Sequence, residues 1–204
     1  MNVDTTHLLA IAAALGWASG LRLYAVLFLT GLAGWLGWVQ LPPGLHLLET
    51  PWMLGASGLM LFLEFFADKI PGVDTLWDTV HTLLRIPAGA VLAASVFGVD
   101  QGAWAAGAAL LGGTLAATSH VAKTTTRAAV NTSPEPFSNI ALSLLGDAAV
   151  PGVLWLAFAH PWLGLGAVAL ATLSMIAITV LLFKFLRLAW SRLRGRIGGV
   201  ASPS

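Results

Sequence analysis

The chain contains no cysteine and very little charge. Without cysteine, the protein forms no disulfide and has no thiolate to act as a nucleophile or metal ligand, which excludes several enzyme classes. Only 9% of the residues are charged, whereas soluble domains carry roughly a quarter, so the composition argues against a water-soluble globule. The ten Lys and Arg residues form no basic stripe, and we therefore expect no nucleic-acid partner.

Apolar residues make up 57% of the 204 positions and gather into long runs. A membrane span needs about 20 mostly apolar residues. On that measure we predict an all-α, polytopic membrane helix bundle that is embedded in the lipid bilayer. We expect six spans: 7–38, 51–69, 85–99, 102–122, 137–159 and 162–186. The first segment is long and carries Gly16, Ser19 and Gly20 just before Arg22, so we expect a helix that breaks near Arg22.

Residues 74–85 predict an amphipathic helix. Its polar side chains recur every three or four residues and share one helical face opposite an apolar one: Asp74, Asp78, His81 and Arg85. We expect this helix to lie at the membrane interface with its polar face in water. The alternative is that it extends the third span inward.

Positive charge gathers near the C-terminus, from Lys184 to Arg196. Loops rich in Lys and Arg stay in the cytoplasm, so we expect a cytoplasmic C-terminus, and six spans then place the N-terminus on the same side. Residues 1–204 form one membrane domain in this interpretation, and residues 189–204 form a basic cytoplasmic tail.

An aspartate ends a similar apolar phrase twice, at Asp68 within 63–73 and at Asp147 within 142–153. Three predicted spans fall in each half of the chain, 1–100 and 101–188. Because three is an odd number, duplicated halves would have opposite orientations in the membrane. Such inverted 3+3 repeats are typical of transporters.

Charged residues within the spans are the candidate transport pathway: Arg22, Glu64, Asp68, Lys69, Arg127 and Asp147. Each costs about 2.5 to 3.5 kcal/mol in a span, so we expect them to face protein or water and to pair, with Arg22 contacting Asp147. Glu64 and Asp68 are one helical turn apart, a spacing suited to exchanging a proton or holding a cation. The alternative is that these charges only lock helices together.

A polar stretch, 131–139, contains two prolines and predicts a loop. If the loop is purely structural, it caps the fifth span. If it is functional, its polar residues line the entrance to the transport pathway: Asn131, Ser133, Glu135 and Asn139. A possible cofactor is a divalent cation held by Asp74, Asp78 and His81, whose oxygen and imidazole groups suit one. The alternative, which ordinary helix statistics favour, is that Asp78, His81 and Arg85 form a solvated, self-paired helix face. No hydrolase or NTPase motif is present.

Three segments together resemble a bacterial integral membrane family of unknown function, catalogued as domain of unknown function 4126. They are Ser19-Gly20-Leu21-Arg22, the segment 68–78 that begins Asp68-Lys69-Ile70-Pro71-Gly72, and the segment 127–136. The resemblance covers most of the chain and implies a multi-pass protein of the bacterial cytoplasmic (inner) membrane. It implies no substrate, mechanism or functional residue.

These observations favour a small inverted-repeat transporter or permease for a small solute or ion, with proton coupling through a carboxylate. One alternative is a metal-dependent membrane enzyme acting on a lipid head group. Another is a structural or accessory subunit. Six short spans leave little room for a wide pathway in one copy, so a homodimer is expected.

Overall fold

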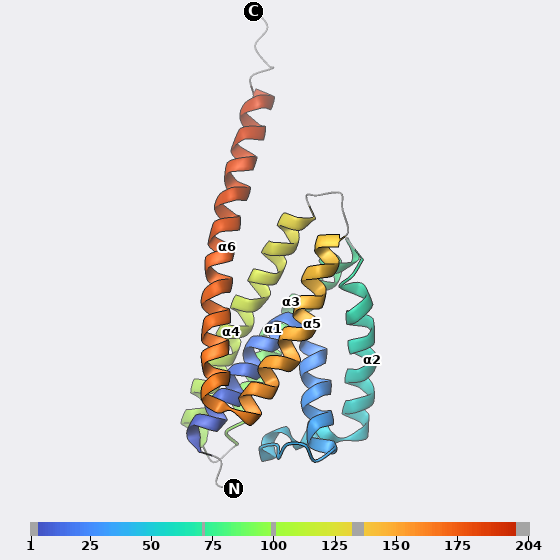
Figure 1. Cartoon of the computed structure of the whole chain (residues 1–204), viewed down its shortest axis with the longest axis vertical. Coiled ribbons are helices and arrows are strands. Elements are labelled where there is room, and N and C mark those ends of the chain that lie inside the picture. Colours follow the sequence, from blue (N-terminus) through green and yellow to red (C-terminus); the bar gives the residue numbers. More distant parts are fainter. Residues whose placement is uncertain (1–3, 71, 99–100, 132–136, 199–204) are drawn as a thin grey trace, which may run out of the picture.

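The computed structural model describes residues 4–70, 72–98, 101–131 and 137–198, and the regular secondary structure in those residues is entirely helical. The elements follow in the order α1 (Thr5–Trp35), η1 (Pro43–Glu49), α2 (Pro51–Ala67), α3 (Val73–Ser95), α4 (Gly102–Val130), α5 (Phe137–Ala159) and α6 (Pro161–Gly198). They pack as a bundle around α1, and α6 lies along one side and extends past the other helices (Figure 1).

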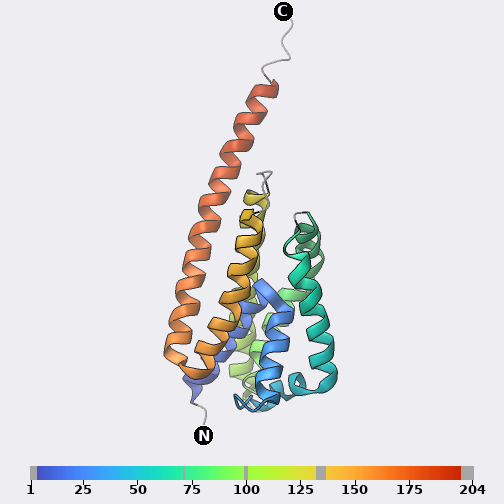
Figure 2. The same ribbon diagram turned by 45° about the vertical axis from the view of Figure 1, so that its right-hand side comes forward.

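Helix α1 is broken at Arg22, where the backbone angles are non-helical (φ −147°, ψ 82°). Its first arm runs into the bundle, and its second arm runs back to the end from which the first began (Figures 1 and 2). The predicted break near Arg22 is confirmed. The break makes α1 a helical hairpin with Arg22 at its tip.

The hairpin lies in the protein core, and every residue from Ala10 to Leu23 is buried. Glycines let the helices approach this closely. A Cβ on Gly16 of α1 would lie against the backbone of Gly112 of α4, and a Cβ on Gly112 would lie 2.7 Å from the carbonyl oxygen of Gly89 of α3. Close approach of small residues is how membrane helices gain packing contacts where lipid supplies no hydrophobic force.

Helix α3 corrects one prediction. Residues 73–95 form one continuous helix, which follows a turn at Gly72 (φ 89°), so no separate interfacial helix precedes the third span. Its polar face is buried against the bundle, whereas Leu76, Val80 and Leu83 are exposed. The two faces of the helix are therefore oriented opposite to the expectation for an interfacial helix. The polar face points into the protein, and the apolar face points outward, where lipid is the solvent.

Four helices are long and apolar enough to cross a membrane: α1, α4, α5 and the part of α6 from Pro161 to Phe185. The pair η1 and α2, bent by 69°, makes a fifth candidate. These helices are those of a multi-pass membrane protein. Helix α3 is outside this set because of the charged side chains on its buried face, although its 23 residues reach about 34 Å at 1.5 Å per residue.

The start of α1 and the end of α6 lie at opposite ends of the bundle (Figures 1 and 2). Six crossings were expected to bring the two chain ends to one side. The arrangement differs because α1 turns back at Arg22. The predicted tail from residue 189 continues α6 as helix to Gly198, and residues 199–204 lie outside the described part.

Candidate functional site

Ten charged side chains from α1 to α5 and the turn after α2 form one connected set of ten ion pairs, which we call the charged network. Five are acidic and five basic, so the formal charges cancel. The members are Arg22, Glu64, Asp68, Lys69, Asp74, Asp78, Arg85, Lys123, Arg127 and Asp147. Every Lys and Arg before Lys184 belongs to it.

Arg22 occupies the tip of the α1 hairpin and joins α2 to α5. Its Nη1 lies 3.0 Å from Asp68 Oδ2, and its Nε lies 2.9 Å from Asp147 Oδ1. Its Nη2 donates hydrogen bonds to the carbonyl oxygen and hydroxyl of Ser143, at 3.0 and 2.8 Å. The predicted contact between Arg22 and Asp147 is confirmed, and with it an aspartate from each half of the chain meets one arginine.

Asp68, at the C-terminal end of α2, is fully buried among three cations. In addition to Arg22, Lys123 Nζ lies 3.1 Å from its Oδ2 and Arg127 Nη1 lies 3.1 Å from its Oδ1. A buried carboxylate needs such partners because its desolvation costs several kcal/mol. Around Asp68 positive charge exceeds negative charge.

On the α3 side, Arg85 is the centre of a second group. It is fully buried, with Nη2 2.7 Å from Glu64 Oε1 and Nη1 2.6 Å from Asp78 Oδ1. Lys123 Nζ, 2.9 Å from the same Asp78 oxygen, connects this group to Asp68. Glu64 and Asp68, predicted to act together, thus bind different cations. Glu64 Oε2 and Arg85 Nε make no hydrogen bond.

Lys69 and Asp147 form the most accessible pair of the network, 2.9 Å apart and about one-fifth exposed on each side. The Lys69 ammonium also lies 3.1 Å from the centre of the Phe65 ring. Where that exposure is to water, such a pair costs less to break than a fully buried one.

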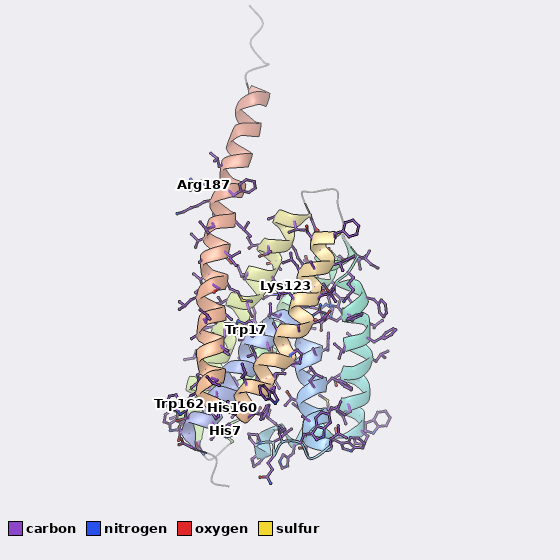
Figure 3. All side chains as sticks on the ribbon, in the orientation of Figure 1. His7, Trp17, Lys123, His160, Trp162 and Arg187 are labelled. Carbon is purple, nitrogen blue, oxygen red and sulfur yellow. The ribbon has the colours of Figure 1, made fainter. Side chains whose placement is uncertain are left out.

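The hairpin's backbone also takes part, because a helix break leaves carbonyl groups without helical donors. Lys123 Nζ donates to the carbonyl oxygen of Leu21 at 3.1 Å, and the Ser119 hydroxyl donates to that of Trp17 at 2.7 Å. Both donors come from α4, and both Lys123 and Trp17 lie inside the bundle in Figure 3. Irregular backbone within a membrane is found where protein or a cavity satisfies it in this way.

A cavity of about 350 Å³ lies beside the hairpin tip, bounded by α1, α4, α5 and α6. Arg22, Asp68, Lys123 and Arg127 line it, with Ser143 beside them, and the remaining wall is mostly apolar. A second cavity of about 490 Å³ lies between the returning arm of α1 and the C-terminal half of α5, lined by apolar residues and Thr30. Arg22 is the last residue of α1 that lines the first cavity, and the second cavity is lined from Leu29 onward along the returning arm.

The predicted polar loop is described only in part. Asn131 donates from Nδ2 to Thr75 Oγ1 at 3.2 Å and to Asp74 Oδ2 at 3.4 Å, which ties the end of α4 to the start of α3. Asn139 is buried in the first turn of α5, and neither its amide nitrogen nor its oxygen has a hydrogen-bond partner. Ser133 and Glu135 lie outside the described residues.

The proposed metal ligands Asp74, Asp78 and His81 are all buried. Asp74 and Asp78 each lie 3.5 Å from Arg127 Nη1, so a cation of the protein itself stands between the two carboxylates. Asp74 accepts hydrogen bonds from the backbone N–H of Gly72 and Thr75, whereas Asp78 pairs with Arg85 and Lys123. The His81 Nδ1 lies 2.8 Å from the Trp77 carbonyl oxygen. Within the described part of the chain, no group of three or more His, Asp or Glu residues is arranged to hold a metal.

Sequence reasoning did not include Arg85, Lys123 or Ser143 among the site residues. The pattern of residues 74–85 places Arg85 on a helix face that was expected to lie in water. The sequence did contain an indication for Arg85 and Lys123. A basic residue within an apolar helix of a membrane protein is costly unless it pairs with an acid, and few basic residues precede Lys184. For Ser143, no pattern distinguishes a site serine from an ordinary membrane-helix serine.

The family model described as Domain of unknown function (DUF4126) matches residues 9–181, and the chain belongs to this family. Its matched range contains the whole charged network. No curated protein and no solved structure matches the chain.

Proposed function

We propose that the protein is a small membrane transporter in which a solute or ion passes the charged tip of the α1 hairpin. The observation that carries the proposal is the position of Arg22. It lies at a helix break inside the bundle, with one cavity beside the first arm of the hairpin and another beside the second. Broken helices that place polar groups near the bilayer midplane are how many secondary transporters build substrate sites.

Arg22 and Asp147 are the groups best placed to respond to a passing solute. The pair links α1 to α5, and Asp147 is shared with the partly exposed Lys69. A solute that competes for either charge would loosen the contact between the hairpin and α5. Proton coupling follows if a carboxylate of the network takes up a proton when its cation turns to the solute.

We further propose that the protein crosses the bacterial inner membrane five times, through α2 to α6, while α1 enters and returns from the outer side. The cluster of bases from Lys184 onward supports a cytoplasmic end for α6. Exposed tryptophans at the ends of α1, α2, α4 and α6 on the opposite side support an outer interface: Trp35, Trp38, Trp52, Trp104 and Trp162. The N-terminal end of α1 is then external.

An inverted relation between the two halves is part of the proposal. Asp68 and Asp147 end the repeated phrases on α2 and α5, which run in opposite directions (Figure 1). Both carboxylates bind Arg22. The halves have diverged, since α4 continues unbroken where α1 turns back.

Transport is tested in proteoliposomes with a panel of small organic anions, cations and neutral solutes, using electrical currents after a concentration jump. The test variant is Asp147→Asn, which keeps the side-chain shape but removes the charge that faces Arg22 and Lys69. Asp4→Asn, at the exposed start of the chain, is the matched control. We expect at least one panel member to give a current that falls about tenfold in Asp147→Asn and is unchanged in Asp4→Asn.

Two results would contradict the proposal. One is the absence of both a protein-dependent current and a protein-dependent uptake of labelled solute for every solute in the panel. The other is an Asp147→Asn current equal to that of the unmodified protein at equal amounts of folded protein, as judged by size-exclusion chromatography.

A further inference from the structure

The cavity beside the hairpin tip has two chemically different parts. At its deep end it is lined by three cations, Arg22, Lys123 and Arg127, against one carboxylate, Asp68. The other four acids of the network do not line it: Glu64, Asp74, Asp78 and Asp147. Of these, Asp147 nevertheless lies 2.9 Å from Arg22 Nε. The charged network is neutral as a whole, yet the side that faces the cavity is positive.

The rest of the wall is apolar and belongs to two helices that diverge. Leu142, Leu145 and Ala149 contribute from α5, and Met175 and Ile178 contribute from α6. The two helices meet at their junction near His160 and separate toward the other end of the bundle (Figures 1 and 2). Leu145 is 66% exposed and Ile178 is 46% exposed, so the rim of the cavity is in contact with the surrounding lipid.

From this lining we infer that the cavity takes an anionic amphiphile, with a carboxylate or phosphate head group at Arg22, Lys123 and Arg127 and its apolar body between α5 and α6. The inference rests on the proposed function in that this amphiphile is the class of substrate transported. Anions are held most strongly by charge-assisted hydrogen bonds from Arg and Lys. An apolar tail would leave the bilayer only partly, since the cavity rim faces lipid.

Hydrogen-bonding capacity for such a head group is present at the deep end. Arg22 Nη1 is buried and lies near Asp68, but it makes no aligned hydrogen bond. Ser143, Thr126 and Ser174 bring hydroxyl groups to the same lining. A head group could therefore be bound by hydrogen-bond donors that already line the cavity, once they turn from their present partners toward it. The volume of about 350 Å³ lies within the range of ordinary small-molecule sites.

Binding is tested on the full chain in nanodiscs of zwitterionic phosphatidylcholine, with 12-bromododecanoate as the probe. Bromine quenches tryptophan fluorescence, and Trp17 lines the cavity. We expect saturable quenching, above the background from probe dissolved in the lipid, that is lost in Trp17→Phe. Dodecyl phosphate is expected to compete, whereas dodecyltrimethylammonium and inorganic phosphate are expected to compete at least about tenfold more weakly.

A cavity-filling variant locates the site without touching the charged network. Ser174 lines the cavity from α6, whereas Ala177, also exposed on α6, does not. Ser174→Phe is expected to weaken probe binding about tenfold, and Ala177→Phe to leave it unchanged.

The inference is overturned by any of three results: equal competition from the cationic amphiphile, competition by inorganic phosphate as strong as that by dodecyl phosphate, or equal probe affinity in Ser174→Phe and Ala177→Phe. The second result would assign the site to a free anion. Because nanodisc binding involves no flux, binding without transport in proteoliposomes would refute the proposed function and leave the site standing. Transport without saturable binding would do the reverse.

Discussion

The first stability prediction concerns Arg85, whose replacement should leave the buried carboxylate of Glu64 without a cationic partner. Arg85 is fully buried between Glu64 and Asp78, and Glu64 has no other ion-pair partner among the described residues. In Arg85→Gln, Asp78 keeps Lys123 at 2.9 Å, but Glu64 keeps no cation. Breaking one partner of a buried pair typically costs about 3 to 5 kcal/mol, so we expect a loss of that size in the free energy of unfolding.

The double variant Glu64→Gln/Arg85→Gln distinguishes a stranded charge from a simple loss of packing. It removes both charges of the pair, so we expect it to be more stable than Arg85→Gln alone, with a coupling energy of about 1 to 3 kcal/mol. Lys69→Gln is the control: Asp147 keeps Arg22 and the pair is partly exposed, so the expected cost is about 0 to 1 kcal/mol.

The measurement is equilibrium unfolding of purified protein in mixed micelles of a mild detergent and dodecyl sulfate. A double variant no more stable than Arg85→Gln would show that Glu64 is not stranded by the loss of Arg85. Equal losses in Arg85→Gln and Lys69→Gln would refute the burial argument itself.

Two further predictions test the re-entrant hairpin and its packing. Because the chain has no cysteine, single cysteine substitutions can be labelled without background. A membrane-impermeant maleimide should label Thr5→Cys and Trp38→Cys from the same side of the membrane and Asn131→Cys from the other side. Labelling of Thr5→Cys and Trp38→Cys from opposite sides would mean that α1 crosses the membrane. Gly112→Ala should lower the unfolding free energy by about 1 to 3 kcal/mol, since its new Cβ meets α3. Gly107→Ala, on the same helix with nothing within 4 Å, should be neutral or slightly stabilising, and equal effects at the two sites would contradict the close packing.

Several features of the site could be predicted because they follow from the cost of charge in lipid. An ionised residue in an apolar run must be paired, and this reasoning found the contact between Arg22 and Asp147. The break near Arg22 followed from the length of the first segment and its small residues. Such reasoning could not assign the other partners, since sequence spacing does not say which helices are neighbours.

Composition and periodicity alone determined that this is an all-helical chain for a membrane, that its first segment breaks, and that α3 has one polar face and one apolar face. Only the tertiary structure decided that the first segment turns back and that the polar face of α3 points inward. The physical reason is that a helical pattern defines faces but not the medium each face meets. That depends on which other helices bring countercharges, as α2 and α4 do here with Glu64, Lys123 and Arg127.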